Sequence, residues 1–306
     1  MSFILLGILN SQAAGAGAGV AGYVAGGNNQ TTVDKFAFPD ETRTTLATGL
    51  SNAVEYNAGF SDPGVAGYNA GGDTGSGYIS TVDKFAFPSD SRSSLATGLP
   101  QDTAFFKGMS NAGVAGYTLG GFVLGGVDEI DDVYKFAFPS DSRSTLASGL
   151  STNRYSTGGF SDVAVAGYSG GGRNDNIGTF YSTVDKFAFP SDSRSTLATG
   201  LSSAESYLGG MSNNGVAGYI AGDDTNTRTA VDKFAFPSDT RTTLGTGLSV
   251  GRKAAAGYSN HSVAGYFAGS DTTANIDRFA FPSDTRTTAA AGLSSVREYP
   301  AGFQDA

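Results

Sequence analysis

Apolar and polar residues alternate along this chain in a block of 45 to 51 residues that recurs six times. Alternation with a period of two indicates half-buried strands, and each alternating run is bounded by Gly, Pro, Asp or Ser, which favour turns. The second block shows the pattern most clearly. It predicts four short strands, at residues 56–60, 65–70, 81–87 and 93–97.

The spacing within the block is constant except in one loop. A Lys-Phe-Ala-Phe-Pro motif, with Arg for Lys in the last copy, begins at residues 35, 84, 135, 186, 233 and 278. The first Phe of the motif is always 14 residues before a Leu, and that Leu is 15 residues before the next Val-Ala-Gly-Tyr box. Only the loop between the second and third strands varies, from 5 to 11 residues. The pattern therefore predicts a rigid scaffold that carries one variable loop per repeat.

Four short strands in each of six repeats predict an all-β fold, a six-bladed β-propeller with four-stranded blades. Phe85 and Phe87 share one face of their strand and are expected to pack against the neighbouring blade. Gly67, in the second strand, is expected where strands crowd near the axis. The turn at residues 88–92 recurs almost unchanged, so we expect Asp90 and Arg92 to have a structural role there.

The end of the chain predicts how the ring closes. Residues 293–306 repeat the pattern of the innermost strand that precedes each Val-Ala-Gly-Tyr box, and Gly19 and Val20 continue this pattern in register. The C-terminal strand should therefore complete the first blade. This divides the chain into a propeller, residues 19–306, and an N-terminal arm, residues 1–18.

Composition excludes several classes of site. The chain has 306 residues, no Cys, one His and a formal charge of −9. Thiolate metal sites are therefore absent, and nucleic acid is not an expected partner because its binding depends on Lys and Arg. No metal site and no cofactor are expected. The longest apolar run, Phe3 to Leu9, is too short to span a bilayer, so no membrane span is predicted.

The repeats resemble the kelch family. Gly71 and Gly72 end a hydrophobic strand, a variable loop follows, Phe85 supplies the aromatic residue, and Leu95 stands where kelch repeats have Trp. The resemblance covers all six units and implies a propeller that binds partners through its loops. The chain departs from the pattern in having no Trp.

The N-terminal arm carries an apolar run followed by an Ala/Gly tether, and its sequence is similar to the openings of phage virion and tail-associated proteins. The resemblance implies a virion component, located on an extracellular particle and bound through this arm to other virion subunits. A frayed terminus and a strand folded back onto the ring are the alternatives. The expected anchoring residues are Phe3, Ile4, Leu5, Leu6, Ile8 and Leu9.

Strand order places the variable loops, and the links that enter each inner strand, on one face of the ring. Tyr and Arg are favoured anchors in interfaces, so this face is predicted to recognise a host-surface glycan or protein. An ordinary mixed rim is the alternative. The expected binding residues are Tyr78, Arg154, Tyr155, Arg173, Phe180, Tyr181, Arg252 and Arg297.

No catalytic residues are predicted, and the chain is expected not to be an enzyme. The acidic stretch at residues 128–132 offers oxygen ligands but lacks the spacing of a calcium loop, so a solvated loop is expected. His261 falls in a turn on the opposite face. Two other functions stay open: a cytoplasmic kelch-type adaptor that holds a partner protein, and a glycosidase with two carboxylates.

Overall fold

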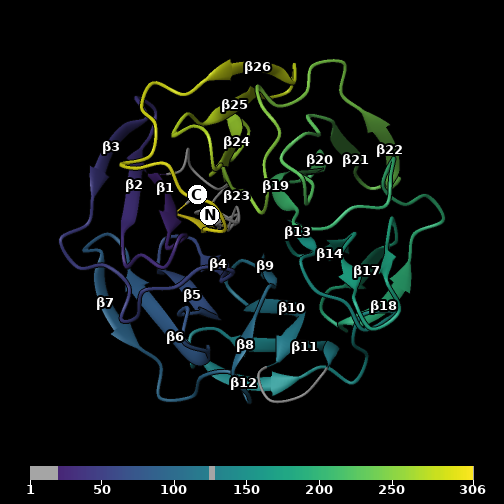
Figure 1. The fold of residues 1–306 in the computed structure, drawn as a ribbon, viewed down its shortest axis with the longest axis horizontal. Coiled ribbons are helices and arrows are strands. Elements are labelled where there is room, and N and C mark those ends of the chain that lie inside the picture. The colour runs from purple at the N-terminus through teal and green to yellow at the C-terminus, as the bar shows by residue number, and fades with distance from the viewer. Residues whose placement is uncertain (1–19, 124–127, 306) are drawn as a thin grey trace, which may run out of the picture.

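The computed structural model describes residues 20–123 and 128–305, and these residues form six blades, each built on four antiparallel strands, around a central axis (Figure 1). No helix occurs in this part of the chain. The six-bladed propeller expected from the repeats is confirmed. The arm predicted for residues 1–18, with its anchoring residues, lies outside the described residues.

Each blade runs from an inner strand at the axis to an outer strand at the rim. The first blade consists of β27 (Ala301–Asp305), β1 (Ala21–Ala25), β2 (Val33–Ala37) and β3 (Thr42–Thr45). The second consists of β4 (Ala58–Asp62), β5 (Ala66–Asp73), β6 (Tyr78–Ala86) and β7 (Ser91–Ser94). The third consists of β9 (Lys107–Asn111), β10 (Ala115–Val123), β11 (Glu129–Ala137) and β12 (Ser142–Thr145), with β8 (Thr103–Ala104) paired to the end of β10.

The remaining blades repeat this order. The fourth consists of β13 (Gly158–Asp162), β14 (Ala166–Gly170), β17 (Val184–Ala188) and β18 (Ser193–Thr196), with a hairpin of β15 (Arg173–Asn174) and β16 (Thr179–Phe180) in its variable loop. The fifth consists of β19 (Gly209–Asn213), β20 (Ala217–Ala221), β21 (Val231–Ala235) and β22 (Thr240–Thr243). The sixth consists of β23 (Ala256–Asn260), β24 (Ala264–Ala268), β25 (Asp277–Ala280) and β26 (Thr285–Thr288).

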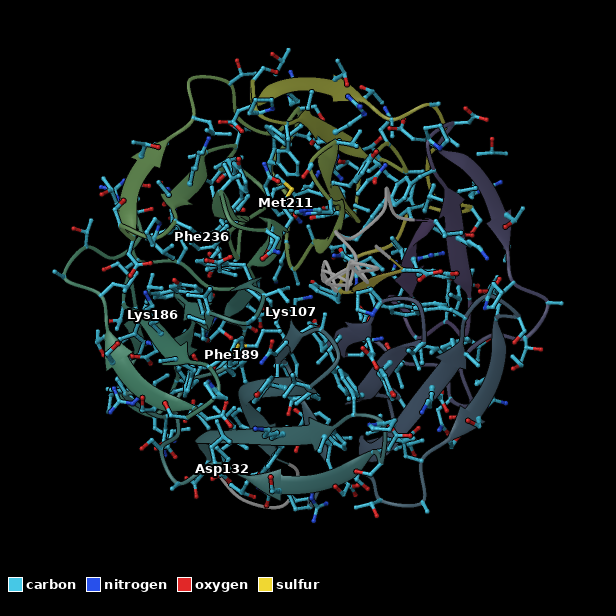
Figure 2. The ribbon with its side chains drawn as sticks, turned by 180° about the vertical axis from the view of Figure 1, so that it is seen from behind. Lys107, Asp132, Lys186, Phe189, Met211 and Phe236 are labelled. Carbon is cyan, nitrogen blue, oxygen red and sulfur yellow. The ribbon has the colours of Figure 1, made fainter. Side chains whose placement is uncertain are left out.

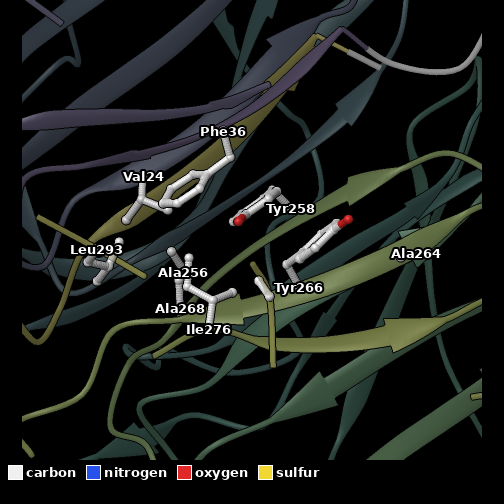
Figure 3. Packing of buried hydrophobic residues seen from close by; sticks show 10 residues of the cluster. Val24, Phe36, Ala256, Tyr258, Ala264, Tyr266, Ala268, Ile276 and Leu293 are labelled. Atoms are coloured by element: carbon white, nitrogen blue, oxygen red, sulfur yellow. The ribbon is translucent and has the colours of Figure 1, made fainter. Parts of the chain in front are cut away.

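The hydrophobic core lies between blades. The Phe303 ring of the first blade stacks on Tyr23 at 5.0 Å and on Phe85 of the second blade at 5.8 Å. A Cβ on Gly67 would meet the Phe303 ring at 2.1 Å, so this strand needs Gly because a neighbouring ring lies flat on it. Figure 3 shows the equivalent cluster between the sixth and first blades, where Phe36 stacks on Tyr258.

A charged clamp joins each blade to the next. In the fourth blade, the Lys186 ammonium lies 2.6 Å from Asp239 in the turn of the fifth, and the Tyr168 hydroxyl donates to the same carboxylate at 2.8 Å. Figure 2 shows Lys186 well away from the axis. At the closure of the ring the clamp is Arg278, Glu41 and Tyr266. There Arg replaces the Lys of the other repeats and Glu replaces the Asp, so the clamp retains its ion pair.

The clamp also gives the turn acids their role. Asp90 does not pair with Arg92 of its own turn but accepts from Lys35 and Tyr23 of the first blade. Arg92 lies 3.4 Å from Asp83 within its own blade. The structural role expected for this turn is therefore supported by contacts, although the two side chains serve different partners.

The C-terminal strand closes the ring as expected. β27 pairs antiparallel with β1, with Ala21 opposite Asp305 and Ala25 opposite Ala301. A closed ring of hydrogen bonds circles the axis. In this ring, one backbone N–H of every inner strand donates to a side-chain oxygen of the next inner strand. Its members are Ser61, Ser110, Ser161, Ser212, Ser259 and Gln304.

Candidate binding face above the hub

The two faces of the ring differ in the way the sequence predicts. The loops between second and third strands and the links into the inner strands lie on one face, here called the variable face. The turns between inner and second strands, together with the Pro-containing turns, lie on the opposite turn face. Variation in length is therefore confined to the variable face.

At the centre of the variable face, one residue from each link adopts a left-handed backbone conformation. These residues have φ between 50° and 61°, and four backbone N–H groups donate to the carbonyl of the preceding member: Tyr56 to Tyr299, Phe105 to Tyr56, Ser156 to Phe105, and Ala254 to Tyr207. Six symmetric links therefore meet around the axis, just before the inner strands begin.

Four aromatic side chains of this ring, together with Tyr155 beside Ser156, form an aromatic floor, defined here as Tyr56, Phe105, Tyr155, Tyr207 and Tyr299. The Tyr56 ring stacks on Phe105 at 3.8 Å and on Tyr299 at 4.1 Å, and Tyr155 meets Phe105 edge-on at 5.6 Å. Tyr155 and Tyr207 are buried, whereas the other three rings are half-buried. A continuous aromatic surface thus reaches solvent above the hub.

Charged groups of both signs surround the aromatic floor. The Lys253 ammonium lies 4.5 Å from the Tyr207 ring centroid and 5.6 Å from that of Tyr299. The Arg173 guanidinium lies over the Tyr155 ring at 5.5 Å and pairs with Asp175. The floor therefore offers flat apolar faces beside hydrogen-bonding groups.

One acid beside the floor has an altered pKa. Burial, followed by the nearby carboxylates of Asp73 and Glu298, raises the pKa of Glu55 to about 7. Backbone bonds in both directions between Glu55 and Asp73 hold this residue against the end of β5. Near neutral pH this carboxyl group is therefore partly protonated and able to donate a hydrogen bond.

Directly below the floor, a lysine occupies the hub, the axial region where the six inner strands meet (Figure 2). The Lys107 ammonium donates to the carbonyl oxygens of Pro300 at 3.1 Å and Ala254 at 3.3 Å. Burial lowers the pKa of Lys107 to about 7. Lys107 also lines a small cavity at the axis, together with glycines of all six blades.

Three of the predicted binding residues are inside the protein. Arg154, Arg252 and Arg297 have no exposed surface, so the expectation that they form part of a recognition surface is corrected. Each guanidinium pairs with an Asp on the third strand of the blade it enters, at 2.8 to 3.0 Å. The partners are Asp185 for Arg154, Asp277 for Arg252 and Asp34 for Arg297.

The other predicted residues are on the variable face but form two groups. Tyr78 meets the floor edge-on through Phe105, at 5.9 Å. Arg173, Phe180 and Tyr181 belong to the variable loop of the fourth blade, where Phe180 is exposed and Arg173 packs on it at 5.1 Å. The hairpin of β15 and β16 thus brings Arg173 from the loop to the floor.

Of the aromatic floor, the predicted binding residues include only Tyr155, although the sequence also places Tyr56, Phe105, Tyr207 and Tyr299 in the links of the variable face. Their signal is present in the sequence, because all four stand six residues after the Leu of the repeat. The sequence does not reveal that the backbone at this position is left-handed. The left-handed backbone brings the side chains of the links together at the axis.

The acidic stretch also differs from the expectation of a solvated loop. Glu129 begins β11 and is buried, and its carboxylate accepts from the Asp175 N–H and the Asn176 side chain, both at 2.6 Å. It therefore fixes the fourth blade's loop. Within residues 20–123 and 128–305, no group of three or more His, Cys, Asp or Glu side chains is placed to hold a metal ion.

Comparisons with known proteins give a fold. No family model matches the chain, and no curated protein matches it. A solved structure described as "Structure of YjhT" is similar, with a TM-score of 0.69 and 14% identity, and the match covers 89% of this chain and 95% of the other. Nowhere in the described chain is there a helix that would cross a membrane. At this level of identity the likeness establishes the propeller architecture alone.

Proposed function

We propose that this protein is a non-enzymatic binding propeller whose variable face recognises a host-surface glycan. The observation that carries the proposal is the aromatic floor, where half-buried rings lie beside Lys253, Glu55 and Glu298. Tyr rings supply rigid amphipathic contact area at small entropic cost, and the C–H faces of a sugar stack on such rings. The neighbouring charged groups supply donors and acceptors for its hydroxyl groups.

The chain offers its own matched substitutions for a test. Ser156 and Ala254 occupy the same left-handed ring position as Tyr56 and Tyr299, so Tyr56→Ser and Tyr299→Ala reproduce side chains that this backbone already carries. We expect the double variant to keep its melting temperature and to lose at least about tenfold in affinity on a glycan array, because truncating an interface anchor costs more than about 1 kcal/mol.

The control variant is Val114→Ser, at an exposed position on the turn face. Its glycan binding should equal that of the unmodified chain. If the double variant binds every glycan as tightly as this control, the aromatic floor is not the binding site. If the unmodified chain binds no glycan but retains a host-surface protein, the predicted ligand is a protein; if it retains only a cytoplasmic protein, the adaptor replaces the glycan proposal.

We further propose that the protein is a virion component, held to other virion subunits by residues 1–18. This part rests on the similarity of the N-terminal sequence to phage structural proteins, and on the confinement of variation to one face of the ring. A chain without residues 1–18 should fail to enter particles. Normal incorporation of that chain would remove the anchoring role from the arm.

One observation favours the glycosidase as a second candidate. Glu55 has a pKa raised to about 7 and lies close enough to Glu298 for the two carboxylates to interact, and a protonated acid beside a second carboxylate is the pair that such enzymes use. Release of reducing sugar from a bound glycan, abolished by Glu55→Gln, would establish this activity. The non-enzymatic proposal requires no turnover in that assay.

A further inference from the structure

A funnel opens along the axis on the turn face. It has a volume of about 180 Å³ and is lined by residues from all six blades. Its floor is the ring of inner-strand glycines, its wall includes the hydrogen-bonded ring of Ser and Gln, and its rim is formed by turn residues such as Pro63, Val163 and His261. The funnel therefore faces away from the candidate binding face.

The chemistry of the funnel restricts what it can hold. Among the residues that the structure describes, no Asp, Glu, Lys or Arg lines the funnel, and the Ser and Gln side-chain oxygens already accept hydrogen bonds from neighbouring strands. Met109 and Met211 contribute to the wall, and methionine adapts readily to apolar partners. For comparison, an engineered apolar cavity of about 150 Å³ binds benzene. The funnel thus suits an uncharged ligand, such as one or two large aliphatic side chains.

The chain itself carries such a ligand close by. The described chain begins at Val20 on the turn face, and the Val20 N–H donates at 2.7 Å to the backbone carbonyl oxygen of Asp305 at the end of an inner strand. Residues 3–9 form an uncharged apolar run, and the ten residues 10–19 extend to at most about 35 Å. The tether therefore has ample length to reach the funnel mouth.

We propose that the axial funnel binds the chain's own apolar run, residues 3–9, in the free protein. A short tether gives the run an effective concentration in the millimolar range, which favours its own funnel over that of a second copy at micromolar protein. Burial of Ile and Leu side chains supplies the driving force, and it covers a run that would otherwise promote association. When the protein is anchored in a particle, residues 3–9 would then leave the funnel and bind another apolar partner.

The composition of the chain permits a direct test on the full-length protein. It has no Cys and three Met, of which Met109 and Met211 line the funnel. A nitroxide on the Ser11→Cys variant should broaden the ¹³C-methyl signals of Met109 and Met211, and reduction with ascorbate should restore them. Met1 should broaden in every such sample and serves as the internal positive control. A nitroxide on Ser76→Cys, at an exposed position on the variable face, should leave Met109 and Met211 sharp.

Two further samples make the test decisive. Adding Leu5→Asp and Leu6→Asp to the Ser11→Cys variant should restore both funnel signals while Met1 stays broadened. Mixing spin-labelled chain with separate methyl-labelled chain should leave the funnel signals sharp. The proposal fails if these signals are sharp in the original variant, if the aspartates do not restore them, or if broadening occurs only in the mixture, which would assign the funnel to a second copy.

Discussion

At the scale of single residues, the hub departs from the symmetry of the repeat at one position. The first residue of the inner strand is Ala or Gly in five blades, whereas in the third blade it is Lys107. The equivalents are Ala58, Gly158, Gly209, Ala256 and Ala301. The Lys107 ammonium donates to two carbonyl oxygens, and desolvation is what shifts its titration. The positive charge at the axis is therefore a cost to folding, which the carbonyl contacts only partly offset.

This cost predicts how stability depends on pH. The pKa of Lys107 is lowered to about 7 in the folded chain, against about 10.4 when unfolded, so the unfolded state binds more protons between these values and stability rises with pH across that window. Lys107→Met should therefore raise the melting temperature by several degrees at pH 6, and the gain should shrink steadily up to pH 10. The control is Lys253→Met, which removes a positive charge on the variable face, outside the hub. If the difference in melting temperature between Lys107→Met and the unmodified chain is the same at every pH, the lowered pKa of Lys107 is contradicted.

The arginines show where residue-level prediction from sequence ends. Arg154 was correctly placed in a link on the variable face, but its side chain turns inward to Asp185, 31 residues later in the chain. Its counterpart Val54 cannot pair with Asp83, which accepts instead from the hydroxyl groups of Ser51 and Ser94 and from Arg92. Residue type and spacing identify the link, whereas the direction of the Arg154 side chain is set by its contact with Asp185 in the folded blade. The sequence likewise places the aromatic residues of the floor in the links, but their meeting at the axis is a property of the folded ring.

At the scale of elements, the interface between blades combines stacked rings with the ion-pair clamp. The strands follow the predicted pattern, although in the second blade the inner strand is β4, two residues later than expected, because Tyr56 belongs to the left-handed ring and does not extend β4. The sequence predicted the apolar contacts of Phe85 and Phe87 from their alternation. It did not predict the clamp, since Lys84 and Asp141 are 57 residues apart and meet only when two blades pack together.

The clamp predicts a specific loss of stability. Asp141 accepts from Lys84 at 2.6 Å and from Tyr68 at 2.7 Å, and its φ of 55° is a conformation that Asn also tolerates. Asp141→Asn should therefore keep the turn while removing the charge, and lower the free energy of unfolding by about 1.5–3 kcal/mol. Urea unfolding measures the loss. Asp40→Asn, at an exposed acid in the corresponding turn of the first blade, should change it by less than about 0.5 kcal/mol.

At the scale of the whole molecule, the ring closes because each inner strand has a glycine where it comes closest to its neighbours at the axis. Six glycines, one in each inner strand, form a ring in which a Cβ on each would meet the backbone carbonyl oxygen of its neighbour at 1.8 to 2.3 Å. They are Gly59, Gly108, Gly159, Gly210, Gly257 and Gly302. The last of them belongs to β27, so the strand that closes the ring also completes the hub. Closure and the tight hub are thus two aspects of one arrangement.

The hub should therefore reject even one added methyl group. A Cβ on Gly302 would lie 2.3 Å from the Gly257 carbonyl oxygen, and neither backbone can retreat without opening the ring. Gly302→Ala should cost at least about 2–3 kcal/mol, because overpacking forces the strands apart. Gly245→Ala is the matched control: its Cβ meets nothing within 4 Å, and five other repeats carry Ala at that position. Melting temperatures compare the two, and an equal value for both variants would mean that the six inner strands do not meet as closely as a closed ring requires.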